Sequence, residues 1–174
     1  SPPPASPGLA YAVPTEFVEL PSKGEYYPED HPFYKQEAVE IRFMTAKDED
    51  ILSSQALLKK GLVIDRLLDS LIVADVDSST LLVGDRSALL VAARISSYGS
   101  DYDIVYTCPK CMTKNEVKFD LSNGQISDLC FNEKHLKENN ISYNAETLTF
   151  DVVLPVSGVT VGLDLIDGKT EKQF

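Results

Sequence analysis

Residues 64–72 read IDRLLDSLI, and the fold class follows from this stretch because it has a clear helical period. Its apolar side chains recur at spacings of three and four residues: Ile64, Leu67, Leu68, Leu71 and Ile72. That spacing places them on one broad face of an α-helix, with charged and polar side chains on the opposite face. The stretch therefore predicts an amphipathic helix that packs its apolar face against a core.

A strand and another helix are expected just before this helix. Residues 37–44 alternate between apolar and charged side chains, which is typical of a half-buried strand. Thr45 then has the character of an N-cap, and the acidic residues 48–50 complement the positive end of a helix dipole. This helix should run to about Lys60 and end at Gly61, where glycine favours a C-cap.

A third helix is expected over residues 86–98. Asp85 is a suitable N-cap for it, and Gly99 is a suitable stop at its other end. The three helices together predict a helical layer.

The pattern changes to a period of two in the second half of the chain. Residues 102–107 and 115–119 predict two strands on either side of a Cys-x-x-Cys motif, and residues 147–154 and 160–166 predict two more. We therefore expect an α+β fold, in which a layer of three helices packs with antiparallel strands. The strands include a Cys-x-x-Cys β-hairpin that resembles the knuckle of a zinc ribbon.

The composition limits the function classes that the chain can serve. The 174 residues include 16 basic and 27 acidic side chains, which give a formal net charge of −11. Such a chain is repelled by phosphate backbones, so nucleic acid is not an expected partner. No run approaches the roughly 20 apolar residues that a membrane span needs. Three cysteines are too few for a secreted disulfide framework, and they favour a reducing compartment.

The sequence divides into three segments. Residues 1–35 are rich in proline and aromatic residues and predict an extended arm, residues 36–101 hold the first strand and the helices, and residues 102–174 are rich in strands. The last segment should be cut off before a further helix, for which Asp167 is a suitable cap.

Aromatic side chains in the first segment are candidate anchors for a partner protein. Aromatic residues are enriched where proteins bind each other, and prolines hold this segment extended. The candidate partner-binding residues are Phe17, Tyr26, Tyr27 and Phe33. The alternative is that these rings fold back onto the protein's own core.

The motif TCPKCMTK at residues 107–114 is a candidate structural zinc site. A proline-containing turn between two strands aims two thiolates at one metal, here those of Cys108 and Cys111. The remaining ligands of a tetrahedral site would be Cys130 and His135, or side chains beyond residue 174. A metal-free turn and a redox-active pair are the two alternatives.

No motif of an enzyme is evident. The chain lacks a Gly-rich phosphate loop, a nucleophile elbow and paired histidines on a helix, so we expect no catalytic activity. The loop at residues 75–80 begins like a calcium loop, but Thr80 stands where glycine is needed and Arg86 where a bidentate glutamate belongs. We interpret it as an acidic loop.

Five motifs in order resemble one protein family. They are VELPSKGEYYPEDHP, VEIRFMTAKDEDIL, LLKKGLVIDRLLDSLI, LLVGDRSALLVAARISSYG and YDIVYTCPKCMTKNEVKFDL. This order is similar to that of the baseplate hub proteins, also described as hub assembly chaperones, of T-even-like contractile-tailed phages. The resemblance covers about residues 17–121 and extends more weakly to Lys172.

The resemblance implies a structural and assembly role without enzymatic activity. The protein would be a hub subunit in the virion tail, assembled in the cytoplasm of the bacterial host. It would bind other hub proteins and the tape measure protein, in several copies of a symmetric assembly. The alternatives are a transient assembly chaperone that is absent from the mature virion, and a zinc-binding interaction module of other function. Family members also imply a second cysteine pair past residue 174, which would complete the zinc site.

Overall fold

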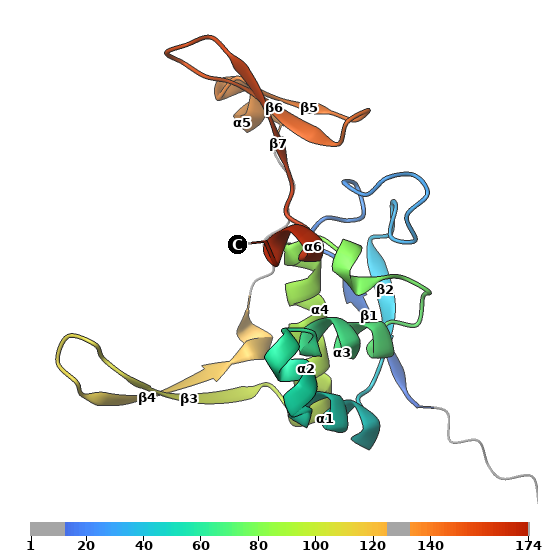
Figure 1. The fold of residues 1–174 in the computed structure, drawn as a ribbon, viewed down its shortest axis with the longest axis vertical. Coiled ribbons are helices and arrows are strands. Elements are labelled where there is room, and N and C mark those ends of the chain that lie inside the picture. Colours follow the sequence, from blue (N-terminus) through green and yellow to red (C-terminus); the bar gives the residue numbers. More distant parts are fainter. Residues whose placement is uncertain (1–12, 125–132, 174) are drawn as a thin grey trace, which may run out of the picture.

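The computed structural model describes residues 13–124 and 133–173, with the side chains of Glu133 and His135 excepted. In that part of the chain, helices and a short sheet form a body from which two β arms project (Figure 1). The body contains β1 (Thr15–Glu19), β2 (Ala38–Arg42), α1 (Ala46–Ser53), α2 (Gln55–Lys60), α3 (Val63–Leu71), η1 (Ser78–Thr80) and α4 (Val83–Tyr98). The first arm contains β3 (Asp101–Thr107) and β4 (Lys114–Asp120), followed by η2 (Leu121–Asn123). The second contains α5 (Glu133–Glu138), β5 (Ile141–Asn144), β6 (Thr149–Val153) and β7 (Thr160–Asp164), after which α6 (Gly168–Glu171) returns to the body.

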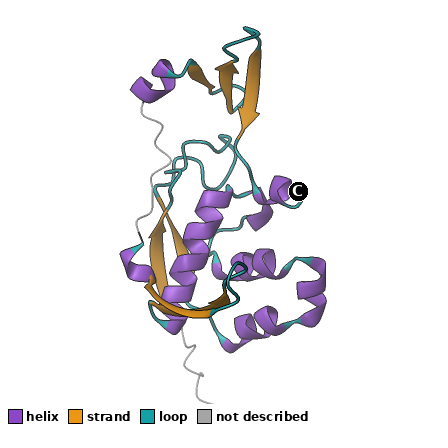
Figure 2. Ribbon diagram, turned by 90° about the vertical axis from the view of Figure 1, so that its left-hand side faces the viewer, coloured by secondary structure: helices purple, strands orange, loops and turns teal. Residues whose placement is uncertain are grey.

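The strands of the described residues form three separate antiparallel sheets. β1 pairs with β2, β3 pairs with β4, and the third sheet has the order β5-β6-β7. Figure 2 shows the β5–β7 sheet beyond one end of the long helix α4, and the β1–β2 sheet lies beside that helix. The fold is therefore a mixture of helices and antiparallel sheets, as the sequence predicts.

The core lies between the β1–β2 sheet and helices α3 and α4. Val39 and Ile41 alternate along β2 and point inward, and both are buried. The stripe on α3 meets them, with Leu68 and Leu71 fully buried. Ile64 is the exception, because it lies at the edge of this stripe and is exposed. The amphipathic pattern at residues 64–72 thus identifies the helix and most of its core face.

The predicted helix over residues 46–60 is interrupted at Ser54. Ser54 is extended, with φ −69° and ψ 106°, so α1 ends there and α2 begins. Its hydroxyl accepts a hydrogen bond from the Leu57 amide, which makes Ser54 the N-cap of the second helix. The predicted ends are confirmed: Thr45 forms a capping box with Asp48, and Gly61 ends α2 in the left-handed conformation.

The predicted start of the third helix is wrong. Helix α4 begins at Val83, so Asp85 lies inside its first turn rather than at the cap. Asp85 is fully buried and accepts hydrogen bonds from the Ser22 amide, the Ser22 hydroxyl and the Tyr27 hydroxyl. It therefore anchors the N-terminal segment to α4.

The boundary predicted at residue 35 falls inside one folded unit. β1 precedes this boundary and pairs with β2, which follows it. Between the two strands the chain turns tightly at Gly24, whose φ is 69°. A Cβ at this position would overlap the carbonyl oxygen of Phe33 and the amide of Gln36. Residues 13–35 therefore belong to the body and do not form an extended arm.

The chain returns to the body after the second arm. An isolated β-bridge joins Leu82 and Asp167, and the Val83 amide donates to the carbonyl of Ile166 at 3.0 Å. Asp167 caps α6 by accepting from the Thr170 amide at 2.7 Å, as its sequence context predicts. Within residues 13–124 and 133–173, no helix has the length and apolar character needed to cross a membrane.

Candidate assembly interface

The β3–β4 arm, residues 101–120, is an amphipathic two-stranded ribbon. Residues paired across an antiparallel ladder share a face, and alternate residues along a strand lie on opposite faces. The pairs Tyr102↔Phe119 and Ile104↔Val117 therefore lie on the same side as Tyr106. We call this set the ribbon face. The opposite side carries charged residues, including the ion pair between Lys118 and Asp103 at 3.5 Å.

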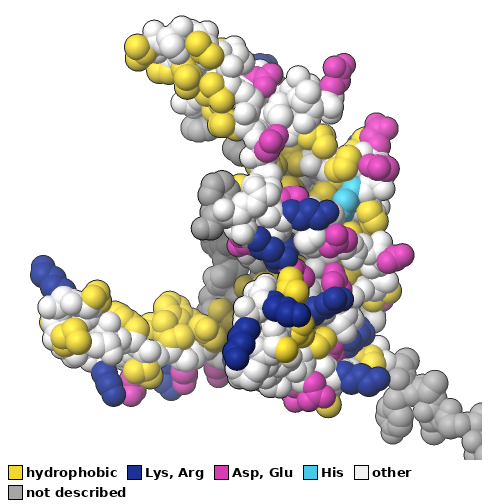
Figure 3. All heavy atoms as spheres, in the orientation of Figure 1, with side chains coloured by type: hydrophobic (Ala, Val, Ile, Leu, Met, Phe, Trp, Pro, Cys, Tyr) yellow, Lys and Arg dark blue, Asp and Glu magenta, His cyan; other side chains and the backbone are white. Residues whose placement is uncertain are grey.

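The ribbon face is open to solvent. Tyr102, Tyr106 and Phe119 are 43%, 49% and 49% exposed, and Ile104 and Val117 are half-buried. Figure 3 shows hydrophobic side chains along this arm, which stands away from the body. A two-stranded ribbon with one uncovered apolar face has marginal stability by itself. Such a face is typical of a surface that is buried in an assembly.

The turn between β3 and β4, residues 108–113, holds the predicted cysteine pair, and we call it the cysteine turn. The Cys108 amide donates to the Thr113 carbonyl at 2.9 Å, and the Met112 amide donates to the Cys108 carbonyl at 2.8 Å. Met112 has a φ of 57°, the left-handed conformation that glycine often supplies in such a turn. Hydrogen bonds from Thr113 and then from Cys108 lower the pKa of the Cys111 thiol. The two thiols are not joined in a disulfide.

The structure does not bring the predicted zinc ligands together. Cys130 and the side chain of His135 lie outside the described residues. The backbone of α5, which carries His135, packs beside β5 in the second arm, far from the cysteine turn (Figure 1). The described residues contain no cluster of three or more metal-binding side chains. A complete four-ligand site is thus not formed by the described part of the chain.

The β5–β7 sheet is amphipathic in the same way. Its register places one set of apolar side chains on a single side, which we call the sheet face: Ile141, Tyr143, Phe150, Val152, Val161 and Leu163. Phe150 is buried at 6% exposure, whereas Leu163 at the edge is 51% exposed. The loop after β6 adds Val156, which is 99% exposed. The second arm therefore also presents apolar side chains to solvent (Figure 3).

Tyr26 attaches this sheet to the body. Its ring packs edge-on against Tyr143 with a centroid distance of 5.3 Å, and it lies 5.7 Å from the Phe150 ring. Tyr26, which was predicted to contact a partner, is half-buried, and its ring meets the sheet face of its own chain; the partner contact stays a prediction.

The other predicted partner-binding rings divide between core and surface. Tyr27 and Phe33 are 2% and 0% exposed, so these two rings are part of the hydrophobic core and not of a surface. This corrects the prediction for both, and the fold-back alternative describes them. Phe17 is 73% exposed on β1, pointing away from the core. It remains a candidate contact residue.

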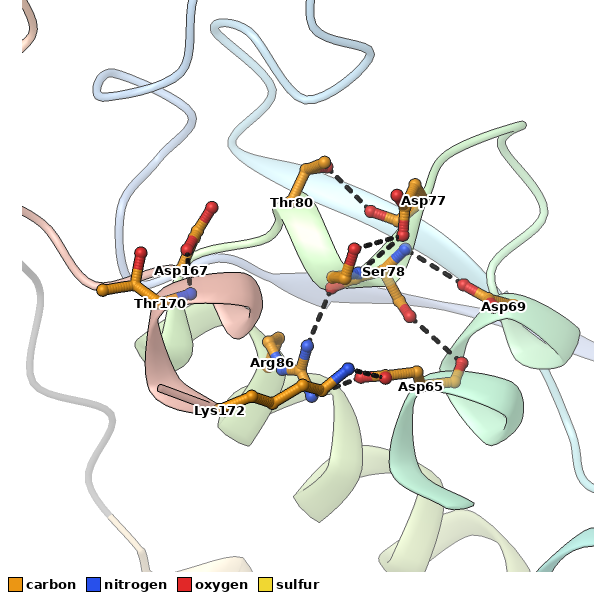
Figure 4. A network of polar contacts seen from close by, with 10 residues as sticks. Asp65, Asp69, Asp77, Ser78, Thr80, Arg86, Asp167, Thr170 and Lys172 are labelled. Carbon is orange, nitrogen blue, oxygen red and sulfur yellow. Dashed lines mark hydrogen bonds and ion pairs between the residues drawn. The ribbon is translucent and has the colours of Figure 1, made fainter. Parts of the chain in front are cut away.

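A polar network, which we call the clasp, fixes α6 at the base of the second arm (Figure 4). The carboxylate of Asp65 on α3 accepts from Arg86 of α4 at 2.9 Å and from Lys172 after α6. Arg86 also donates to the Ser78 carbonyl at 3.0 Å, and the Ser78 hydroxyl donates to the Asp65 carbonyl at 3.0 Å. The clasp joins four elements, and its charges are paired with each other, which suits a structural role.

The sequence pattern does not reveal the clasp. Asp65 falls on the polar side of the predicted helix, where solvent exposure is the usual expectation. It is 8% exposed, because η1 packs against α3 and the side chains of Arg86 and Lys172 reach its carboxylate. In the acidic loop, Asp77 caps η1 by accepting from the Ser79 amide at 3.0 Å.

The fold and its two open apolar faces define a small mixed α/β protein with the surface of an assembly component. A family model described as T4 bacteriophage base plate protein matches residues 13–158, which include the body, the first arm and most of the second. The chain belongs to this family and is a structural component of a phage baseplate in the virion tail. No curated protein and no solved structure matched the chain.

Proposed function

We propose that this baseplate protein is a hub subunit that binds other hub proteins and the tape measure protein through its two β arms. The observation that supports the proposal is the pair of uncovered apolar faces on arms that project from one body. Sheet faces of this kind are buried by packing against another layer, and the described chain supplies no complete cover for them. The role needs no catalysis, and we propose none.

The two arms offer a bipartite surface. In Figure 1 the first arm projects to the left of the body and the second arm lies above it. A partner that reaches both arms buries more apolar area than one that touches a single ribbon, and buried area supplies much of the driving force of association. Phe17 lies on β1 and is an additional contact in this proposal.

The test is incorporation of variants into baseplates. Tyr106→Ser with Phe119→Ser removes two exposed rings from the ribbon face without touching the core. We expect a folded protein, with an unchanged circular dichroism spectrum, that enters baseplates poorly. Matched changes on the opposite side of the same strands, Asp103→Ser with Lys118→Ser, should leave incorporation intact because that surface is solvated. Normal incorporation of the first variant would exclude the ribbon face.

A transient assembly chaperone is the second candidate function. It would use the same surfaces but leave before the particle is complete, in the cytoplasm of the bacterial host. Mass spectrometry of purified virions distinguishes the two roles. A hub subunit is present in a fixed ratio to other baseplate proteins, whereas a chaperone is present in assembly intermediates and missing from virions. A zinc-binding interaction module of other function would leave tail assembly unaffected when the gene is deleted.

A further inference from the structure

We propose that the outer edge of β1 binds an extended segment of another protein, one that carries a basic side chain, as a third strand of the β1–β2 sheet. The hydrogen bonds of this sheet fix which way each backbone group of β1 points. The Phe43 amide donates to the Pro14 carbonyl at 2.8 Å, and the Leu20 amide donates to the Glu37 carbonyl at 2.8 Å. Both bonds continue the register of β1 with β2, and bonded and non-bonded pairs alternate along an antiparallel ladder. The even-numbered residues of β1 therefore bond to β2, and the odd-numbered ones point away from it.

Three residues of β1 consequently have backbone groups that point away from β2: Thr15, Phe17 and Glu19. Among the described residues, no group bonds to the amide or the carbonyl of any of these three. All three are exposed, and they alternate with the half-buried Glu16 and the buried Val18. The edge therefore offers free donors and acceptors over roughly 13 Å, at a rise of about 3.3 Å per residue.

The opposite edge of the sheet is already bonded. The Val73 amide donates to the Glu40 carbonyl at 3.1 Å, and an isolated β-bridge joins Ile41 and Ile72. Glu40 is the register partner of Phe17, so the two residues point their backbone groups outward on opposite sides of the sheet. In the described chain only the β1 side lacks such a bond. An uncovered strand edge is the place where an extended peptide adds to a sheet.

The charges of β1 indicate the chemistry of the partner. The strand reads TEFVE, with two acidic residues and no basic one. The Oε1 atom of Glu16 is buried and accepts no hydrogen bond from the described residues. On an added antiparallel strand, the residue opposite Glu16 would form a non-bonded pair with it, in which the two side chains lie close together on one face. A lysine or arginine there supplies the missing donor, whereas a second copy of this chain brings a net charge of −11 to an acidic edge.

The exposed ring of Phe17 determines the neighbouring position of the partner segment. The residue opposite Phe17 follows or precedes the one opposite Glu16 and lies on the other face of the sheet. An apolar side chain there packs against a ring that is 73% exposed. The partner segment therefore has an apolar residue next to a basic one, in an extended stretch without proline. The inference extends the proposed contact of Phe17, but it does not require the two arms to bind.

The test measures peptide binding by the full chain with NMR. The probe is the capped peptide Thr-Val-Val-Lys-Thr, and the two controls are the same peptide with glutamate in place of lysine and the same peptide with the amide of its third residue methylated. We expect the probe to slow hydrogen exchange about tenfold or more at the amides of Thr15, Phe17 and Glu19. The amides of Glu16 and Val18 already belong to the ladder and should change little. Both control peptides should bind about tenfold more weakly, because each lacks a bond to the edge.

Two substitutions at Phe17 separate the backbone from the ring. Phe17→Ala removes the ring and keeps the amide, whereas Phe17→Pro also removes the outward N–H. The β1–β2 ladder does not use this N–H and proline is tolerated on edge strands, so circular dichroism should show that both variants fold. We expect Phe17→Pro to bind the probe about tenfold more weakly than Phe17→Ala. If Phe17→Pro does not fold, the methylated peptide tests the same kind of bond on the wild-type chain.

Four results would overturn the proposal. They are equal binding by two folded Phe17 variants, equal binding of the lysine and glutamate peptides, equal binding of the methylated peptide, and no protection of the edge amides by the probe. A dimer that forms without peptide and is lost in Phe17→Pro would assign the edge to a second copy, and it would also overturn the proposal. None of these results bears on the two arms, which the baseplate incorporation of the ribbon-face variant tests separately.

Discussion

The buried carboxylate of Asp48 joins three elements of the body. Arg42 of β2 donates to both of its oxygens at 2.8 Å, and Ser70 of α3 and the Thr45 amide complete its hydrogen bonds. Burial by itself raises the pKa of Asp48, but these hydrogen bonds outweigh burial and hold the pKa well below its usual range. Folding therefore favours the ionised form of Asp48.

We predict that Asp48→Asn lowers the free energy of unfolding by about 3 kcal/mol at pH 7, because Arg42 loses a buried partner. The folded pKa lies below the unfolded one, so the contribution is full above about pH 4 and is lost as the pH falls below that value. The difference between wild type and variant should therefore shrink in acid. Urea unfolding at pH 7 and pH 3 measures both effects. The exposed Asp50→Asn is the control, and an equal loss in it would refute this role of Asp48.

His31 is held as a neutral ring between the N-terminal segment and η1. The Phe33 amide donates to its Nδ1 at 3.0 Å, and its Nε2 lies 2.9 Å from the Thr80 hydroxyl. The ring also stacks on Tyr27 with a centroid distance of 4.4 Å. Burial lowers the pKa of His31, although the charge of Asp30 opposes the shift. Protonation of Nδ1 would break the hydrogen bond from the Phe33 amide, because two N–H groups would then point at each other.

We predict that the protein loses stability as the pH falls from 7 to 5. The pKa of His31 is lower in the folded state, so the contribution is full above the ordinary value of about 6.5 and is lost as the pH falls through the folded pKa. Chemical unfolding at several pH values measures this slope. His31→Asn keeps an acceptor near Phe33 but does not titrate, so the slope should flatten. A variant with the wild-type slope would mean that other groups cause it.

The structural roles of some of these polar residues can be predicted from the sequence, whereas those of others cannot. Thr45 and the acidic residues after it are recognisable, because an N-cap needs local spacing only. Asp85 and Asp65 are not, because their partners are 63 and 21 residues away in sequence and only the fold brings them together. A buried carboxylate and a solvated one have the same letter in the sequence. The hydrophobic periodicity of the sequence therefore could not predict the clasp.

At the scale of elements, α6 depends on close packing at its first residue. Gly168 is buried against Arg86, and a Cβ there would overlap the Arg86 guanidinium and lie 3.1 Å from the Ser79 carbonyl. Arg86 cannot move aside without breaking its bonds to Asp65 and Ser78. The glycine thus sets the distance between α6 and the clasp.

We predict that Gly168→Ala releases α6 from the body. Loss of the buried ion pair and of the helix contact should lower the free energy of unfolding by roughly 2–4 kcal/mol. Hydrogen exchange should also become faster at the Val83 and Gly168 amides, which bond across this junction. Gly162→Ala in β7 is the control, because a Cβ there makes only ordinary contacts at 3.5 Å or more. Unchanged exchange in Gly168→Ala would contradict this account of the junction.

Helices and strands could be predicted where a single hydrophobic pattern runs along the whole element. Strand β2 and helices α3 and α4 follow directly from their periods, and the C-terminal end of α2 follows from the glycine at position 61. The break at Ser54 was missed because serine is tolerated inside helices and its role as a cap depends on the angle at which α2 leaves α1. Strand β5 was missed because its four residues are too short for a clear alternation.

At the scale of the whole molecule, two contacts among the described residues attach the second arm to the body. The first is the junction of Leu82 and Asp167 beside the clasp. The second is the ring of Tyr26, which reaches from the body to Tyr143 and Phe150 on the sheet face. The sequence could not separate a ring that binds a partner from one that binds its own chain, because both are aromatic residues in a proline-rich segment. The two attachments together orient the second arm above the body, while the first arm projects to the left (Figure 1).

We predict that Tyr26→Ala frees the second arm while the body stays folded. The lost ring contacts correspond to about 1 kcal/mol, which is small beside the stability of a core that does not include Tyr26. The radius of gyration from small-angle X-ray scattering should therefore increase, while the urea midpoint changes little. Tyr102→Ala removes an exposed ring from the other arm and should change neither quantity. If the radius is the same in Tyr26→Ala and wild type, the junction at Leu82 and Asp167 is sufficient to orient the arm. If it increases and baseplate incorporation falls with it, the fixed spacing of the two arms is itself what a partner recognises.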